Sequence, residues 1–110
     1  MRTIQNVAKV NSEGHFADPP FLVLASLAEG PKHGHAMLND IDIMCGRRLG
    51  PGTLYGAIGR LERQGLIEPL PVDDRRQPYR LTRAGHAAFA ARLGVMQRIV
   101  AIGAARLAPL

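Results

Sequence analysis

The sequence lacks tryptophan, is poor in aromatic residues and contains a single cysteine. The scarcity of cysteine excludes a small protein held together by disulfide bonds. Cys45 alone cannot build an intrachain disulfide framework, so a reducing compartment is expected. The N-terminal segment lacks the continuous apolar run of a secretory signal. Arg98 and Arg106 interrupt the longest apolar stretch, 93–110, below the ~20 residues needed to span a bilayer. We therefore expect a cytoplasmic protein without a membrane partner.

Positive charge is in excess and unevenly placed. Fourteen Lys and Arg against nine Asp and Glu give a net charge of +5 at pH 7, with an isoelectric point near 10.4. Residues 18–46 carry −3, whereas residues 47–83 carry +4 and residues 84–110 carry +3. A chain of 110 residues that is 46% hydrophobic and 21% charged has the size and composition of one folded globular domain. Its basic balance favours an anionic partner such as nucleic acid or an acidic membrane.

Three short helices are predicted in residues 18–65. Asp18 is a good N-cap before Pro19, and apolar residues recur at helical spacing until Gly30 ends the first helix. The second helix, 33–45, ends at Gly46, and its apolar stripe consists of Met37, Ile41, Met44 and Cys45. The third begins after Gly50 with Pro51 and ends at Gly65, and its core positions are Leu54, Ile58 and Leu61.

A hairpin and a long helix complete the chain. Residues 66–71 and 77–81 flank a charged tip, which predicts a β-hairpin, and Thr82 caps a helix that lasts to about Leu107. Three short helices followed by a basic hairpin are typical of a winged helix-turn-helix, whose third helix enters a major groove. We predict a mainly α fold with a small β-hairpin. Its parts are an N-terminal arm (1–17), a winged helix-turn-helix DNA-binding domain (18–83) and a C-terminal dimerisation helix (84–110).

Four motifs carry a resemblance to a known family. They are Ala28-Glu29-Gly30-Pro31-Lys32-His33-Gly34-His35, Pro51-Gly52-Thr53-Leu54-Tyr55, Arg60-Leu61-Glu62-Arg63-Gln64-Gly65-Leu66-Ile67 and Tyr79-Arg80-Leu81-Thr82-Arg83-Ala84-Gly85. In this order and spacing the chain resembles the PadR family of bacterial transcriptional regulators, and its single C-terminal helix resembles the smaller subgroup of that family. The resemblance implies a homodimeric repressor of nearby genes that binds a palindromic operator in double-stranded DNA and is released by a small effector.

The chain departs from the family pattern at three positions. His35 stands where the family usually has an aromatic residue, Gly50 where it has Ser or Thr, and Gly59 where it commonly has a larger polar or basic residue. Some members hold flat aromatic effectors against a tryptophan at the dimer interface, and this chain has none.

The third helix and the hairpin tip supply most of the residues predicted to contact DNA. Near the start of the helix, Thr53 and Tyr55 are placed to donate hydroxyl hydrogen bonds to phosphates. Its glycines share an outward face that would let the helix backbone approach the groove floor closely. The complete predicted set is Lys32, His33, Gly52, Thr53, Tyr55, Gly56, Arg60, Arg63, Arg75, Arg76 and Tyr79.

Each assignment has a purely structural alternative. Tyr55 is also consistent with a half-buried packing residue, Arg63 with the partner of a solvated carboxylate, and the pair Arg75 and Arg76 with a solvated turn. For the helix glycines, the alternative is drift at exposed sites in a protein with stability to spare. For the whole domain, the alternative is a winged-helix module that binds a protein, which would need an apolar or acidic third helix.

A metal site or an enzyme is not predicted. His33 and His35 invite a metal hypothesis, with His86, Cys45 and Asp40 as further ligands, but two His residues at this spacing lie about 200° apart on a helix. A surface or packing role is favoured for them, and Cys45 is expected to pack as a small hydrophobic residue rather than act as a thiol sensor. No nucleophile elbow, phosphate loop or carboxylate pair emerges, so a small metal- or thiol-dependent enzyme is the weakest alternative and no cofactor is expected.

The long C-terminal helix carries an apolar stripe that needs a partner. Its predicted dimerisation residues are Phe89, Leu93, Met96, Val100 and Leu107. Three short helices leave little surface to cover a helix of this length, so pairing with a second chain is favoured over packing within one chain.

Overall fold

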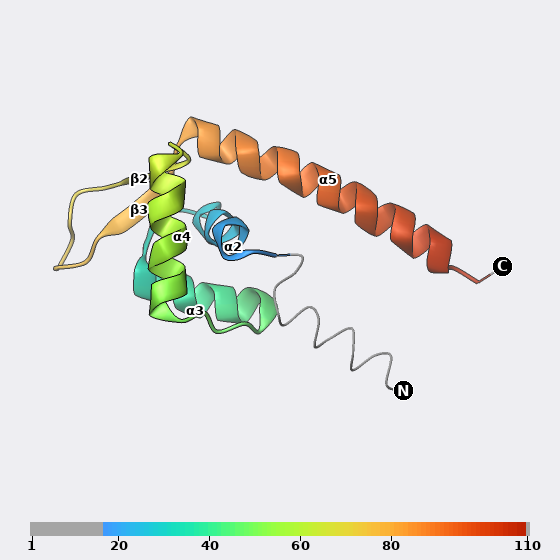
Figure 1. The fold of residues 1–110 in the computed structure, drawn as a ribbon, viewed down its shortest axis with the longest axis horizontal. Helices are drawn as coiled ribbons and strands as arrows, with labels where there is room; N and C mark the ends of the chain where they lie inside the picture. Colours follow the sequence, from blue (N-terminus) through green and yellow to red (C-terminus); the bar gives the residue numbers. More distant parts are fainter. Residues whose placement is uncertain (1–16, 110) are drawn as a thin grey trace.

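The computed structural model describes residues 17–109, so nearly all of the predicted N-terminal arm lies outside the described residues. The described chain forms, in order, α2 (Pro19–Leu27), β1 (Lys32–His33), α3 (Gly34–Cys45), α4 (Pro51–Arg63), β2 (Ile67–Pro69), β3 (Pro78–Leu81) and α5 (Arg83–Leu107). Figure 1 shows α2, α3 and α4 gathered beside the small sheet, with α5 running away from them. The predicted fold class and the order of a winged helix-turn-helix are confirmed.

The sheet has three antiparallel strands in the order β1-β3-β2, one more than the predicted hairpin. Lys32 pairs with Tyr79 across β1 and β3, and Ile67 pairs with Leu81 across β2 and β3. The strand β1 is only two residues long, and Lys32 in it pairs with Tyr79, 47 positions away, so no local sequence pattern predicts this strand. We expected His33 to begin a helix, and this was wrong because it closes β1 and caps α3 instead.

The helix α2 forms the centre of the core. Asp18 caps it by accepting a 2.9 Å hydrogen bond from the backbone N–H of Phe21, and a proline occupies its first turn as predicted. Packed against α3, α4 and α5, it is buried on most of its surface. The core cluster consists of Leu22, Val23, Leu24, Leu27, Met37, Leu38, Ile41, Leu49, Leu54, Ala57, Ile58, Leu61 and Ile67.

The end of α3 is more exposed than the sequence predicts. Met37 and Ile41 are fully buried, but Met44 is 43% exposed and Cys45 is exposed. The expectation that Cys45 packs as a small hydrophobic residue was therefore wrong; its thiol donates to the backbone carbonyl of Ile41. The last turn of the helix extends beyond the core. Gly46 then ends the helix in the left-handed conformation, with φ +69°.

The helix α5 leaves the core after its first three turns. Thr82 caps it, as predicted, and Gly85 is its only buried residue within the described chain. A Cβ at Gly85 would overlap the backbone carbonyl of Leu66, so glycine is required for this close approach. By length and composition alone α5 could cross a membrane, contrary to the expectation drawn from Arg98 and Arg106.

Candidate nucleic-acid interface

The helix α4 has a buried face and a nearly bare outer face. Leu54, Ala57, Ile58 and Leu61 point into the core. On the opposite side lies the glycine face, which we define as Gly52, Gly56, Gly59 and Arg63. A Cβ added at Gly52 or Gly56 would meet only open space, and one at Gly59 would approach only the mobile end of the Arg63 side chain, at 3.3 Å. The outer side of this helix is therefore open along its backbone.

Tyr55 lies on one flank of the glycine face and contacts the start of α3. Its ring and hydroxyl pack so closely on Gly34 that a Cβ there would overlap them, while 54% of the residue remains exposed. The structure shows the packing role considered for Tyr55, and the phosphate contact by its hydroxyl stays a prediction. Tyr55 holds α3 and α4 at a fixed separation and still presents surface to solution.

His33 links the start of α3 to the wing, by which we mean β2, β3 and the connection between them. Its Nδ1 accepts a 3.4 Å hydrogen bond from the backbone N–H of Ala36, and its Nε2 lies 3.2 Å from Nη1 of Arg76. This contact brings two predicted DNA-binding residues together, although they are 43 positions apart in the sequence.

Lys32 faces inward rather than toward solution. Its ammonium pairs with Glu29 at 2.8 Å and Asp40 at 3.7 Å, donates to the backbone carbonyl of Ser26, and leaves the side chain only 13% exposed. The Ser26 hydroxyl in turn donates to Asp40 at 2.7 Å. This network ties α2, β1 and α3 together, and the predicted phosphate contact by Lys32 stays a prediction that the geometry does not favour.

The tip of the wing is a tight turn with an unusual backbone. Asp73 and Arg76 exchange two backbone hydrogen bonds of 2.9 Å, and the residues between them, Asp74 and Arg75, have φ values of +50° and +64°. A two-residue turn with both φ values positive is the type I′ hairpin turn, which normally selects Asn and Gly. Two charged residues hold it here, so Arg75 extends from a strained tip.

Tyr79 lies at the base of the wing, in β3, and is partly buried against the core. Burial, reinforced by the nearby Glu62 and Tyr55, raises the pKa of Tyr79 above its ordinary value. The shift disfavours the charged phenolate, so the hydroxyl remains a hydrogen-bond donor to a higher pH than an ordinary tyrosine.

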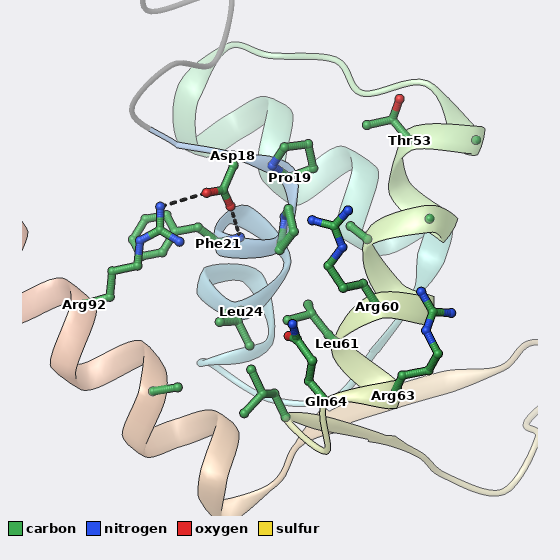
Figure 2. A pocket seen from close by; sticks show the side chains of 16 residues that line it. Asp18, Pro19, Phe21, Leu24, Thr53, Arg60, Leu61, Arg63, Gln64 and Arg92 are labelled. Carbon is green, nitrogen blue, oxygen red and sulfur yellow. Dashed lines mark hydrogen bonds and ion pairs between the residues drawn. The ribbon is translucent and has the colours of Figure 1, made fainter.

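The other flank of the glycine face borders a cleft that sequence analysis missed. This arginine cleft, of about 650 Å³, is lined by residues of α2, α4 and α5. Figure 2 shows Arg60 extending from α4 toward Pro19, with Arg63 one turn further along the helix. Three elements distant in the sequence form the cleft. It therefore depends on how the helices pack together, and no local pattern in the sequence predicts it.

Asp18 and Arg92 close one end of the arginine cleft. Arg92 Nη2 lies 2.8 Å from Oδ2 of Asp18, and its guanidinium lies 4.6 Å from the ring centroid of Phe21 (Figure 2). Burial alone would raise the pKa of Asp18. The hydrogen bonds from Arg92 and the Phe21 backbone, with the charges of Arg92 and Arg60, outweigh it and lower this pKa below its ordinary value.

The predicted dimerisation residues extend from this anchored region into solution. Phe89 packs on Phe21 with ring centroids 5.4 Å apart, so it belongs to the contact between α5 and α2. Further along, Leu93 is 38% exposed, Val100 69% and Leu107 87%. Ile99 and Ile102 add exposed apolar surface to the same helix. Within residues 17–109 this surface has no partner.

Comparisons with known proteins agree with this geometry. The sequence profile of the Transcriptional regulator PadR-like family matches residues 23–91. The chain is 41% identical over 70 residues to "Transcriptional regulator Rv3488" of Mycobacterium tuberculosis, a match covering 61% of this chain and 64% of that protein. It is 50% identical over 68 residues to "Uncharacterized 37.1 kDa protein in transposon TN4556" of Streptomyces fradiae, covering 62% of this chain and 20% of that protein. The chain thus spans less than two thirds of either relative.

The fold has a counterpart among solved structures. A PadR family transcription regulator from hypervirulent Clostridium difficile superimposes with a TM-score of 0.73 over 82% of this chain and 98% of that one, at 20% sequence identity. At this identity the likeness extends to the fold alone.

Proposed function

The chain belongs to the PadR-like family of transcriptional regulators, and we propose that it binds a palindromic operator as a homodimer, represses nearby genes and releases the DNA when a small effector binds. The family consists of transcription regulators rather than enzymes. The observation that carries the proposal is the open outer side of α4, with Thr53 and Arg60 on one flank, Tyr55 on the other and Arg63 on the glycine face itself.

In this proposal α4 enters the major groove and the glycine face lies toward the base edges. The hydroxyls of Thr53 and Tyr55 and the guanidinium of Arg63 make polar contacts around it. Arg75, at the strained tip of the wing, reaches the neighbouring backbone or minor groove, with Arg76 behind it. A protein-binding winged helix would need an apolar or acidic outer side on α4, and this one is neither.

The dimer is supported by the apolar surface of α5. In this helix of 25 residues only Gly85 is buried, so its apolar side chains need a partner surface to pack against. A second copy of the same helix offers a matching apolar surface. A symmetric pair would set two copies of α4 about 34 Å apart, one turn of DNA. We assign residues 18–83 to DNA binding and 84–110 to dimerisation, and the same helix pairing accounts for the apolar character of α5 without a membrane.

A mobility-shift titration on the intergenic DNA beside the gene tests the proposal. At fixed salt the full chain should shift this fragment at a lower concentration than a shuffled fragment of equal length. Arg63→Gln should weaken the specific shift, whereas Arg106→Gln, which removes the same charge from the far end of α5, should leave it nearly unchanged. Equal shifts of the two fragments by the unmodified chain would refute sequence-specific binding.

A further inference from the structure

The arginine cleft carries more positive charge than its own carboxylate can balance. Its charged lining is Arg60, Arg63, Arg92 and Asp18. Arg92 is paired with Asp18, but neither Arg60 nor Arg63 has an ion pair among residues 17–109. Arg60 and Arg63, one turn apart on α4, thus both line this cavity, whose lining has a net charge of +2. Figure 2 shows the Arg60 side chain extending toward α2 and the Arg63 side chain following the outer side of α4, so a ligand held by both draws the Arg63 guanidinium toward the cleft.

The cleft also offers an apolar wall. Leu24 of α2, Leu61 of α4 and Leu66 line it, together with Phe21 and the α5 residue Ala88. A phosphate of the DNA backbone would gain nothing from such a wall. An organic group attached to an anion would bury apolar surface there, which is favourable.

The geometry points to a binding site for a small organic dianion, a phosphate monoester, in the arginine cleft, where the ligand opposes DNA binding. Its two negative charges match the net charge of the lining. Guanidinium forks bind phosphate oxygens bidentately, which suits a pair of arginines. The organic group lies against Leu66 and Ala88, the more accessible apolar residues of the lining.

The ligand opposes DNA binding because the cleft and the proposed DNA-binding surface share residues. Gly52, Gly56, Thr53 and Arg63 line the cleft and belong to the surface proposed to enter the groove. A bound anion would neutralise Arg60 and Arg63 and occupy space beside the glycine face, so the ligand and the DNA would compete. This inference rests on the proposed function, because it gives the chemistry and the binding site of the effector that releases the DNA.

Direct binding is tested first, without DNA. The full chain is titrated by calorimetry at constant ionic strength with phenyl phosphate, inorganic phosphate, phenol and succinate. We expect saturable binding of phenyl phosphate, one molecule per chain, about tenfold tighter than inorganic phosphate because the ring is buried. Phenol should not bind measurably. Preferential binding of succinate would overturn the assignment to a phosphate monoester, and an absence of saturable binding would overturn the site.

Variants locate the ligand. Arg60→Gln and Arg63→Gln should each weaken phenyl phosphate binding by about tenfold, the loss expected for a charge-assisted hydrogen bond. Arg106→Gln is the matched control and should have no effect. Ala88→Phe narrows the cleft from its α5 wall and should abolish binding. Equal weakening by Arg60→Gln and Arg106→Gln would show a general attraction of anions to a basic protein and would contradict the proposal.

Competition with DNA is tested separately by fluorescence anisotropy. At constant ionic strength, saturating phenyl phosphate should reduce the DNA affinity of the unmodified chain by about fivefold or more. It should leave that of Ala88→Phe, which lies outside the proposed DNA interface, unchanged. An unchanged DNA affinity in the unmodified chain would overturn the competition. Phenyl phosphate binding by a chain that binds no DNA would contradict the proposed function while the cleft assignment stood.

Discussion

Single residues in this fold are fixed by what surrounds them more than by their own type. Gly85 and Gly56 are both helical glycines, yet one lies against the backbone of Leu66 and the other faces open space. Cys45 follows apolar residues on its helix but is exposed because the core ends one turn earlier. Such differences depend on packing between segments distant in the chain, so the sequence alone does not separate the two kinds of glycine.

Gly85→Ala should destabilise the protein. The added methyl group would overlap the carbonyl of Leu66, and the start of α5 would have to move away from this residue, at a cost of about 1–3 kcal/mol. Urea unfolding measures the change. Gly56→Ala is the control and should stabilise by about 0.5–1 kcal/mol, because alanine is the better helix former and the position is open. Equal effects of the two substitutions would show that α5 does not approach Leu66 in this way.

Asp18 should make stability depend on pH in the acidic range. Its folded pKa is lowered, so its contribution is fully present above the unfolded pKa, near 3.8, and is lost as the pH falls through the still lower folded pKa. Asp18→Asn keeps an N-cap acceptor but removes the charge opposite Arg92. Urea unfolding should show the variant less stable at neutral pH, by well under about 1 kcal/mol because both side chains are about half exposed.

The difference between the two proteins should shrink below about pH 4 and be smallest near pH 2. A difference that stays constant from neutral to acidic pH would mean that the Asp18 charge does not contribute.

Whole elements were predicted where their signals are local. The helices α2, α4 and α5 were recognised because a cap, a proline or a glycine marks their ends and apolar residues repeat between them. The strand β1 was not, because two residues pairing with β3 leave no periodic pattern. The same distinction applies to the site. The outer residues of α4 follow from helical spacing, whereas the arginine cleft requires α2, α4 and α5 to be assembled.

Alanine substitutions on the glycine face of α4 test whether its backbone approaches the DNA closely. Gly56→Ala combined with Gly59→Ala should raise the melting temperature, since neither added methyl group meets more than the end of a flexible side chain. If the backbone approaches the groove floor, the same pair should weaken specific operator binding while binding to unrelated DNA changes little. Equal or tighter operator binding would favour drift at exposed positions.

The wing should contribute to DNA binding through charge. Replacing Arg75 and Arg76 by Gln in both protomers of a dimer removes four positive charges, so the slope of log K against log salt should shrink by up to about 3.6. A dimer carrying Arg98→Gln and Arg106→Gln loses the same number of charges from α5 and should keep its slope. An unchanged slope in the wing variant would remove the wing from the interface.

At the scale of the whole molecule, two surfaces are incomplete in a single chain. The outer side of α4 is open and flanked by arginines without ion pairs among the described residues, and the far half of α5 exposes apolar side chains over several turns. Figure 1 shows α5 projecting well beyond the other helices, so a partner could cover it without hiding α4. Pairing of two such chains would complete the apolar surface and present two copies of α4 to one duplex.

Hydroxyl-radical footprinting of the intergenic DNA beside the gene shows directly how the protein sits on its operator. A symmetric dimer should protect the backbone in two equivalent segments related by a two-fold axis, with centres about one helical turn apart, within an inverted repeat. A single asymmetric protected segment, or uniform protection without sequence preference, would contradict the proposal that a symmetric dimer places two α4 helices in the major groove.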